Sequence, residues 1–229
     1  MFKPSDFIFR YDVAMSSAYE KLARAGGIEG LRRAGEFFMP DGSVERTLRN
    51  ITTRLDELGI SYAIVGGMAL VSHGYERTTV DVDLLVTEIG LKKIHESLDG
   101  LGYVPPFPGS KYLRDAETGV RIEFLVAGQF PGDGKPKPVA FPDPASSFVE
   151  IDGIKVLAIE KLVELKLASG MTNPGRLKDL ADVQELIRWG VLAPNLIVSY
   201  SHDDADIDYT IEAIRRAAKV YQRAIDQRA

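Results

Sequence analysis

Two aspartates, Asp81 and Asp83, alternate with apolar residues in the stretch VDVDLLV. Side chains at positions i and i+2 of a strand share one face, so both carboxylates point the same way while the residues between them face a core. Two ionised carboxylates held this close repel each other, and a cation between them relieves the repulsion. Hard divalent cations such as Mg2+ prefer such oxygen-only surroundings and keep positions free for water and substrate phosphates.

A third acid, Glu123, lies within the apolar run RIEFLV. A single carboxylate in such a strand is costly unless it is exposed or has a partner. If the two strands are neighbours, Asp81, Asp83 and Glu123 converge, and we predict that they form one metal site. The alternative is that these acids only line a solvated strand face. The third acid and the nearby glycines favour the metal site.

Paired glycines, Gly66 and Gly67, follow a short apolar strand and open a predicted helix that ends near Ser72. Backbone N–H groups at a helix N-terminus attract phosphate through their unpaired donors and the helix dipole. We therefore predict phosphate binding here, although a tight turn that needs positive φ also explains paired glycines. Arg77 and Thr78 lead into the aspartate strand, where Arg77 is placed either to hold a phosphate or to brace an aspartate.

A second set of polar residues lies in the later part of the chain. Lys166 projects from the apolar stripe of its own predicted helix, so its ammonium must reach solvent or meet an anion such as a triphosphate. Asp179 lies near the start of the next predicted helix, where the helix dipole favours a carboxylate even without a function. Arg176 precedes it and is placed to reach a nucleotide phosphate or the acceptor.

The elements that must position these residues change in type along the chain. Period-two alternation and turn residues predict strands at 61–65, 80–86, 111–115 and 120–126, and a hairpin at 148–156 around Asp152-Gly153. Helical spacing predicts helices at 16–38, 43–58, 66–72, 91–98, 157–169, 177–189 and 207–227. Prolines and glycines dominate 130–144, which we predict to be an irregular loop.

This order predicts an α/β (α+β) protein with a mixed central sheet flanked by helices and a helical C-terminal part. We expect three parts: an N-terminal helical extension at 1–45, a core at 46–156, and a helical C-terminal domain at 157–229.

Composition narrows the classes of function. The 229 residues are 45% hydrophobic and 27% charged, an ordinary globular balance. A net charge of -5 gives no overall basic field toward nucleic acid, but it is compatible with a local basic patch. With 0 cysteines, disulfides, thiolate zinc sites and cysteine nucleophiles are excluded. Without a signal-peptide pattern or an apolar run of roughly 20 residues, we expect a cytoplasmic protein with no membrane partner.

The segment GGMALVSHGYERTTVDVDLLV resembles the nucleotidyltransferase signature of the DNA polymerase β superfamily. In that signature, paired small residues open a helix, an Arg-Ser/Thr element follows, and a D-x-D strand ends the motif. Glu123 matches the third acid of the family, which lies on a later strand. The GG form, in place of Gly-Ser, is most similar to the AbiEii-type toxins of abortive-infection and toxin–antitoxin systems. The resemblance covers residues 62–186.

The later part of the chain also resembles the family, whose further motifs are a helix carrying L-K-L, an Arg, and a K-D-x-x-D element. These motifs match Lys166, Arg176, Lys178 and Asp179, which the resemblance places among the nucleotide-binding residues together with Gly66, Gly67, Arg77 and Thr78. The resemblance implies a nucleotidyltransferase fold. It also implies two Mg2+ ions held by Asp81, Asp83 and Glu123, the same three acids acting in catalysis.

The implied reaction moves a nucleoside monophosphate from an NTP to an acceptor hydroxyl. A toxin of this kind would act on tRNA or protein and would have a small antitoxin protein as a partner. Two other functions stay open at this point. One is an adenylyltransferase for a small molecule of the aminoglycoside type. The other is a catalytically idle nucleotidyltransferase fold that serves as a binding partner, which the retained acids argue against.

Overall fold

The computed structural model describes residues 27–28, 42–75 and 79–188. Nearly all of the predicted N-terminal extension, residues 1–26 and 29–41, lies outside the described residues, as does the predicted terminal helix at 207–227. The described helices are α3 (Ser43–Glu57), α4 (Gly66–Ser72), α5 (Glu88–Leu98), α6 (Ile159–Thr172), the 3-10 helix η3 (Pro174–Arg176) and α7 (Leu177–Arg188). The described strands are β1 (Tyr62–Ile64), β2 (Asp81–Val86), β3 (Tyr103–Val104), β4 (Tyr112–Asp115), β5 (Arg121–Val126), β6 (Phe148–Ile151) and β7 (Ile154–Leu157).

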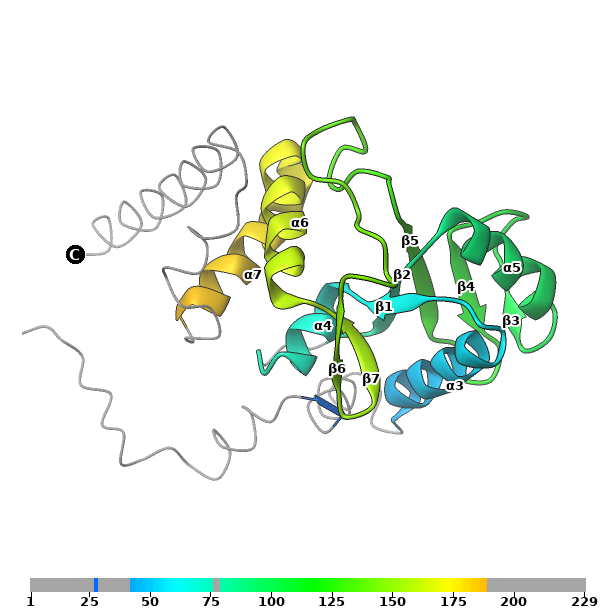
Figure 1. The fold of residues 1–229 in the computed structure, drawn as a ribbon. Coiled ribbons are helices and arrows are strands. Elements are labelled where there is room, and N and C mark those ends of the chain that lie inside the picture. The colour runs from blue at the N-terminus through cyan, green and yellow to red at the C-terminus, as the bar shows by residue number, and fades with distance from the viewer. Residues whose placement is uncertain (1–26, 29–41, 76–78, 189–229) are drawn as a thin grey trace, which may run out of the picture.

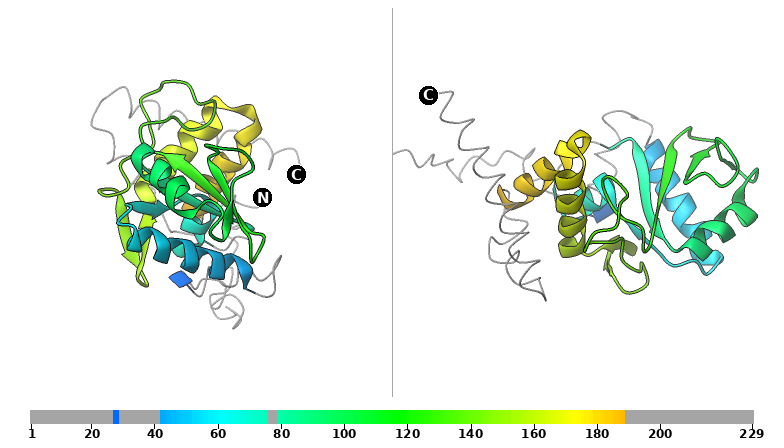
Figure 2. Two further views of the ribbon diagram at one scale, coloured as in Figure 1. Left: turned by 90° about the vertical axis from the view of Figure 1, so that its right-hand side faces the viewer. Right: turned by 90° about the horizontal axis from the view of Figure 1, so that it is seen from above.

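Within the described part, the seven strands form one mixed sheet in the order β3-β4-β5-β2-β1-β7-β6. Two neighbouring pairs, β2 with β5 and β1 with β7, are parallel, and the other neighbours are antiparallel. Helices α3 and α5 lie toward one side of this sheet, and α4, α6 and α7 lie toward the other (Figures 1 and 2). The predicted α/β class, a mixed sheet with flanking helices, is confirmed.

The two central parallel strands explain how the sheet can carry acids. Both β2 and β5 begin with an alternation of partly exposed and buried residues. Val82, Leu84 and Ile122 are fully buried. Helix α3 contacts β2 and buries an aliphatic stripe of Val44, Leu48, Ile51 and Leu55. Each such side chain contributes about 1.5–3 kcal/mol of hydrophobic free energy before entropy losses. Core packing therefore fixes which face of β2 and β5 is left for polar residues.

The hairpin of β6 and β7 follows from its turn. Asp152 has φ +50 and Gly153 has φ +77, so both central residues adopt the left-handed conformation that a type I′ hairpin turn requires. The predicted hairpin around this dipeptide is confirmed. Its second strand leads directly into α6, which places that helix next to α4 and α7.

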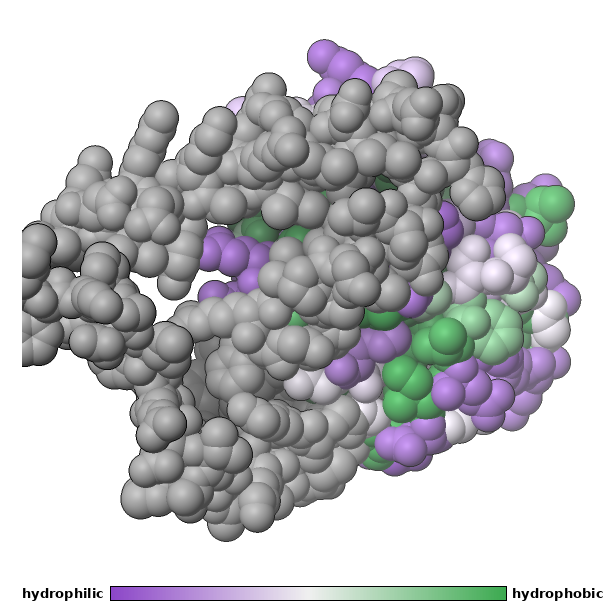
Figure 3. Space-filling view, turned by 60° about the vertical axis from the view of Figure 1, so that its left-hand side comes forward, coloured by the Kyte–Doolittle hydropathy of each residue, from purple (hydrophilic) through white to green (hydrophobic). Residues whose placement is uncertain are grey.

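Figure 3 shows the side of the molecule on which α6 and α7 lie. Where the described surface is visible, hydrophilic and hydrophobic side chains are intermixed. None of the described helices combines the length and apolar character that a membrane span requires.

Candidate active site

The strands that carry the three predicted acids are neighbours, which is the condition on which their convergence was predicted. In the parallel pair of β2 and β5, Asp83 and Glu123 are Cα partners, and Asp81 lies opposite Arg121. All three acids are partly exposed, unlike the residues that alternate with them. The register therefore brings Asp81, Asp83 and Glu123 to one face of the sheet.

Gly66 lies directly against the Asp83 carboxylate. It has φ +63, and a Cβ atom added there would be 2.0 Å from the Asp83 Oδ2 atom. Gly67 donates a backbone hydrogen bond to the same carboxylate. The β1–α4 junction is also tied to β2, because the Val65 amide donates to the Asp83 carbonyl oxygen at 3.0 Å. In this structure the paired glycines let α4 begin against Asp83 of β2, and phosphate binding there stays a prediction.

The electrostatics of Asp83 show a carboxylate with too little positive charge around it. The pKa of Asp83 is raised to about 6, mainly by burial and also by the nearby negative charges of Glu123 and Asp81. The hydrogen bond from Gly67 and the positive charge of Lys166 act against this shift but do not cancel it. A cation beside Asp83 would restore the ordinary ionisation of this carboxylate.

Arg121 and Tyr112 are two residues of this region that sequence reasoning missed. The Arg121 guanidinium is 3.1 Å from the Glu123 carboxylate, and it lies over the Tyr112 ring at 3.9 Å from the ring centroid. Tyr112 is in turn the Cα partner of Glu123 on the neighbouring strand. The available signal was the spacing of Arg121 and Glu123, since residues i and i+2 of a strand share a face.

The fit of a divalent cation can be tested on these residues. Their donors are all carboxylate oxygens, and the raised pKa of Asp83 marks an unmet need for positive charge, so the chemistry suits Mg2+. However, no group of three His, Cys, Asp or Glu side chains among the described residues is arranged to hold a metal ion. Glu123 is engaged with Arg121. The acids thus fit Mg2+ by chemistry and strand position, and they are not a preformed three-ligand set.

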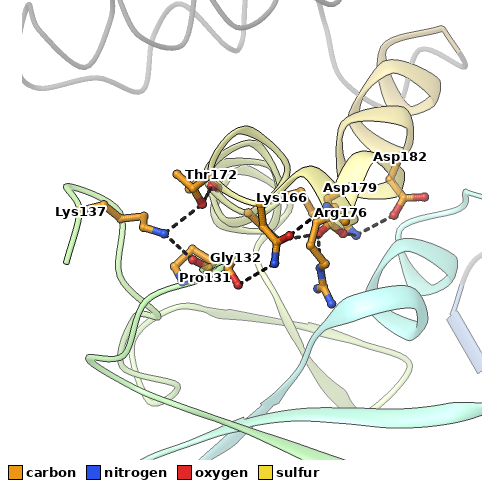
Figure 4. A network of polar contacts seen from close by, with 12 residues as sticks. Pro131, Gly132, Lys137, Lys166, Thr172, Arg176, Asp179 and Asp182 are labelled. Carbon is orange, nitrogen blue, oxygen red and sulfur yellow. Dashed lines mark hydrogen bonds and ion pairs between the residues drawn. The ribbon is translucent and has the colours of Figure 1, made fainter. Parts of the chain in front are cut away.

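Lys166 lies in a buried polar network between α6 and α7 (Figure 4). Its ammonium contacts Asp179 at 2.9 Å and Asp182 at 2.7 Å, and all three side chains are at most 10% exposed. Asp179 also accepts hydrogen bonds from Ser169 at 2.7 Å and Arg176 at 3.0 Å. Of the two outcomes expected for Lys166, it meets an anion, and here the anions are two aspartates of the chain itself.

The pKa of Asp179 reflects this network. Burial acts to raise the pKa, but Lys166, the Ser169 hydroxyl and Arg176 together hold it below its ordinary value. Asp179 is therefore an ionised partner of Lys166 in this structure. Because Lys166 also lowers the pKa of Asp83, the network lies close enough to the acid face to act on it electrostatically.

The other predicted nucleotide-binding residues fall into two groups. The Arg176 side chain is 59% exposed, and Lys178 is exposed at the start of α7, so both are accessible to a ligand. Arg77 and Thr78 lie outside the described residues.

The predicted irregular loop at 130–144 is confirmed as lacking described helix or strand, and it is anchored to α6. The Lys137 ammonium donates to the Pro131 carbonyl at 2.6 Å and to the Thr172 hydroxyl oxygen at 3.0 Å (Figure 4). Asn173 donates to the Gly132 carbonyl at 3.3 Å. Gly132 packs so closely on α6 that an added Cβ would be 2.8 Å from the Ser169 carbonyl oxygen. The loop is therefore a fixed connection between the sheet and α6.

The chain shows partial structural similarity to known protein structures. No family model and no curated protein sequence matches the chain. The antibiotic-resistance factor ANT(2″)-Ia is similar with a TM-score of 0.46 and 13% identity, over 79% of this chain and 95% of that one. An antigenic nucleotidyltransferase-like protein from Paracoccidioides brasiliensis is similar with a TM-score of 0.43 and 21% identity, over 77% of this chain and 86% of that one. The c-di-GMP synthase CdnE from Capnocytophaga granulosa is similar with a TM-score of 0.31 and 11% identity, over 96% of this chain and 89% of that one. At such scores the chemistry has to be argued from the side chains.

Proposed function

We propose that this protein is a metal-dependent nucleotidyltransferase of the DNA polymerase β superfamily. The observation that carries the proposal is the pairing of Asp83 with Glu123 in register, with Gly66 leaving space for the Asp83 carboxylate. A simple solvated strand face would not need a glycine packed against one of its acids. The raised pKa of Asp83 supports a site that binds positive charge.

The residues divide the work of transfer between them. Asp81 and Asp83 would hold Mg2+ on the triphosphate, and Glu123 would complete the site. Bound there, Mg2+ would stabilise negative charge on the attacking and departing oxygens. The acceptor hydroxyl oxygen bonds to the α-phosphorus of the NTP, the bond between the α-phosphorus and its bridging oxygen breaks, and pyrophosphate leaves. Glu123 would accept the hydroxyl proton through a carboxylate oxygen.

Arg176 and Lys178 are exposed, and they would contact the nucleotide phosphates. Lys166 would act on the site mainly through its charge, because its ammonium is already bound by Asp179 and Asp182. This assignment changes the role expected for Lys166 from direct phosphate ligand to the residue that fixes α7 beside the acid face.

We further propose that the acceptor is RNA such as tRNA, with a protein hydroxyl as the second candidate. Arg114 and Arg121 are Cα partners on the face of the sheet that carries Glu123. Two arginines on this face of the sheet favour phosphate groups and disfavour a polycationic aminoglycoside. The role as the toxin of a toxin–antitoxin or abortive-infection system rests on the resemblance of the Gly66–Asp83 segment to AbiEii-type toxins.

The test offers purified protein, Mg2+ and each α-labelled NTP with total RNA, lysate protein and an aminoglycoside in parallel. We expect label in RNA or protein, and none with an Asp81→Ala/Asp83→Ala double variant. Label in the aminoglycoside alone would replace the acceptor assignment. Label in no acceptor, or label that persists in the double variant, would refute the enzyme assignment. Growth arrest on expression that the double variant relieves would support the toxin role.

A further inference from the structure

We infer that Arg121 is a positioning residue that holds the Glu123 carboxylate when no cation is bound and releases it when a divalent cation binds. The inference rests on the proposed function, because it concerns how the proposed cation site is assembled. It explains why three acids share a sheet face without forming a ready set of ligands.

The geometry gives the guanidinium two partners. Its Nη2 atom is 3.1 Å from the Glu123 Oε2 atom, and its Cζ atom is 3.9 Å from the centroid of the Tyr112 ring. Arg121 and Glu123 are neighbours along one strand face, and Tyr112 lies across the strand pair opposite Glu123. The Arg121 side chain therefore reaches diagonally across the sheet, as long side chains can.

The charges around Arg121 explain why it is needed in the cation-free protein. Its Cα partner on β2 is Asp81, and the next pair of β2 and β5 residues on the same face is Asp83 with Glu123. Three carboxylates gathered on one face repel one another. Arg121 supplies a positive charge to this face until a metal ion does so.

A cation and Arg121 compete for the same carboxylate. An incoming ion would need oxygens of Glu123, one of which is bound to Arg121. The ion pair is weak enough to exchange, because the two side chains are 40% and 35% exposed. After release the guanidinium can stay over the Tyr112 ring, where a cation–π contact stabilises it, so it does not lose all its partners.

The test measures Mn2+ binding to the purified full chain without nucleotide, by electron paramagnetic resonance of the free ion. The variants are Arg121→Gln and, as a matched control, Arg114→Gln, which removes the same charge from the Cα partner of Arg121. Each change is also made in a Glu123→Gln background. Thermal unfolding of every variant checks that the protein is folded.

We expect Arg121→Gln to tighten Mn2+ binding about threefold to tenfold, since it removes the group that competes with the ion for the Glu123 carboxylate. Arg114→Gln should change the Mn2+ affinity less than about twofold, because the Arg114 charge is not paired with Glu123 and solvent ions screen it. In the Glu123→Gln background, the Arg121 effect should fall below about twofold if Arg121 acts through Glu123.

Three results would overturn the inference and leave the proposed metal site standing. They are equal shifts in Mn2+ affinity from the two arginine variants, an effect of Arg121→Gln that persists in the Glu123→Gln background, and Mn2+ binding that Arg121→Gln leaves unchanged or weakens. Absence of Mn2+ binding by the wild type and all variants would instead refute the proposed metal site, and the inference with it.

Discussion

Gly66 approaches Asp83 so closely that a methyl group at Gly66 would be 2.0 Å from the carboxylate oxygen Oδ2. Real Cβ atoms do not come this near to a neighbouring oxygen, so one of the two residues would have to move. The contact links the first residue of α4 to the middle of β2. It makes the glycine a requirement of the acid site itself, in addition to any requirement of the turn.

Replacing Gly66 with Ala should therefore remove nucleotidyl transfer by displacing Asp83. The left-handed φ of +63 would also strain any non-glycine residue, at a cost of about 1 kcal/mol. Gly59 separates the two effects, because it has the same φ of +63 but no atom within 4 Å of an added Cβ. We expect Gly59→Ala to lower the free energy of unfolding and leave activity intact, and Gly66→Ala to lose at least about a hundredfold in kcat. Similar activities of the two variants would contradict this account.

Asp83→Asn should stabilise the protein at neutral pH while removing its activity. The pKa of Asp83 rises from 3.8 to about 6 on folding, so the protonated acid stabilises the fold below pH 4 and this contribution is lost as pH rises toward 6. Asn is neutral at every pH and keeps an acceptor for the Gly67 amide. In urea unfolding without divalent cations, we expect the variant to be more stable at pH 7.5 by on the order of 1–3 kcal/mol and nearly equal to wild type at pH 4. A difference that does not depend on pH would show that the charge of Asp83 is not its cause.

Lys166→Met should destabilise the fold strongly by leaving Asp179 and Asp182 buried without their shared cation. Removing one partner of a buried ion pair costs about 3–5 kcal/mol. The matched control is Lys161→Met on the same helix, whose partner Glu164 and own side chain are partly exposed, so the loss should be under about 1 kcal/mol.

The pH dependence gives this prediction a second readout. The lowered pKa of Asp179 stabilises wild type above the unfolded-state pKa, and this stabilisation is lost as pH falls through the lower folded value. The Lys166→Met deficit should therefore be full near pH 7 and shrink only as the pH falls below 3.8, through the lowered folded-state pKa of Asp179. A constant deficit would indicate lost packing and not lost charge pairing.

The loop between β5 and β6 should loosen when Lys137 is replaced by Met, because its contacts with the Pro131 carbonyl and Thr172 would be lost. Hydrogen–deuterium exchange should rise within residues 130–140, while exchange in the strands stays unchanged. Lys135→Met is the control, since Lys135 is exposed on the same loop. Equal exchange in wild type and both variants would show that Lys137 does not anchor the loop.

Local pattern was enough to predict the central part of the fold. The alternation in VDVDLLV and RIEFLV predicted two half-polar strands, and the Asp152-Gly153 dipeptide predicted a hairpin, because each signal depends only on neighbours in the chain. That the two acidic strands are adjacent was a conditional prediction, and the register of Asp83 with Glu123 confirms it.

Pairings between distant residues could not be read in the same way. The sequence left Lys166 with either solvent or an anion, and only the packing of α6 on α7 selects Asp179 and Asp182. Arg121 was overlooked because a charged residue at the start of a strand has many possible partners, and the Tyr112 ring comes from another strand. Tertiary packing decides such contacts, and strand spacing alone does not.

The most direct test of nucleotidyl transfer is to determine which phosphorus atom of the nucleotide is transferred. Purified protein with Mg2+ is incubated with total RNA or lysate protein and with NTP labelled at either the α- or the γ-phosphate. Asp83→Asn serves as the inactive variant, and Glu96→Gln, an exposed acid on α5, serves as the control. We expect the α-label to enter the acceptor and the γ-label to be released as pyrophosphate. Asp83→Asn should abolish both results, and Glu96→Gln should abolish neither. Transfer of γ-label to the acceptor, or α-label transfer that survives Asp83→Asn, would contradict the proposed nucleotidyl transfer.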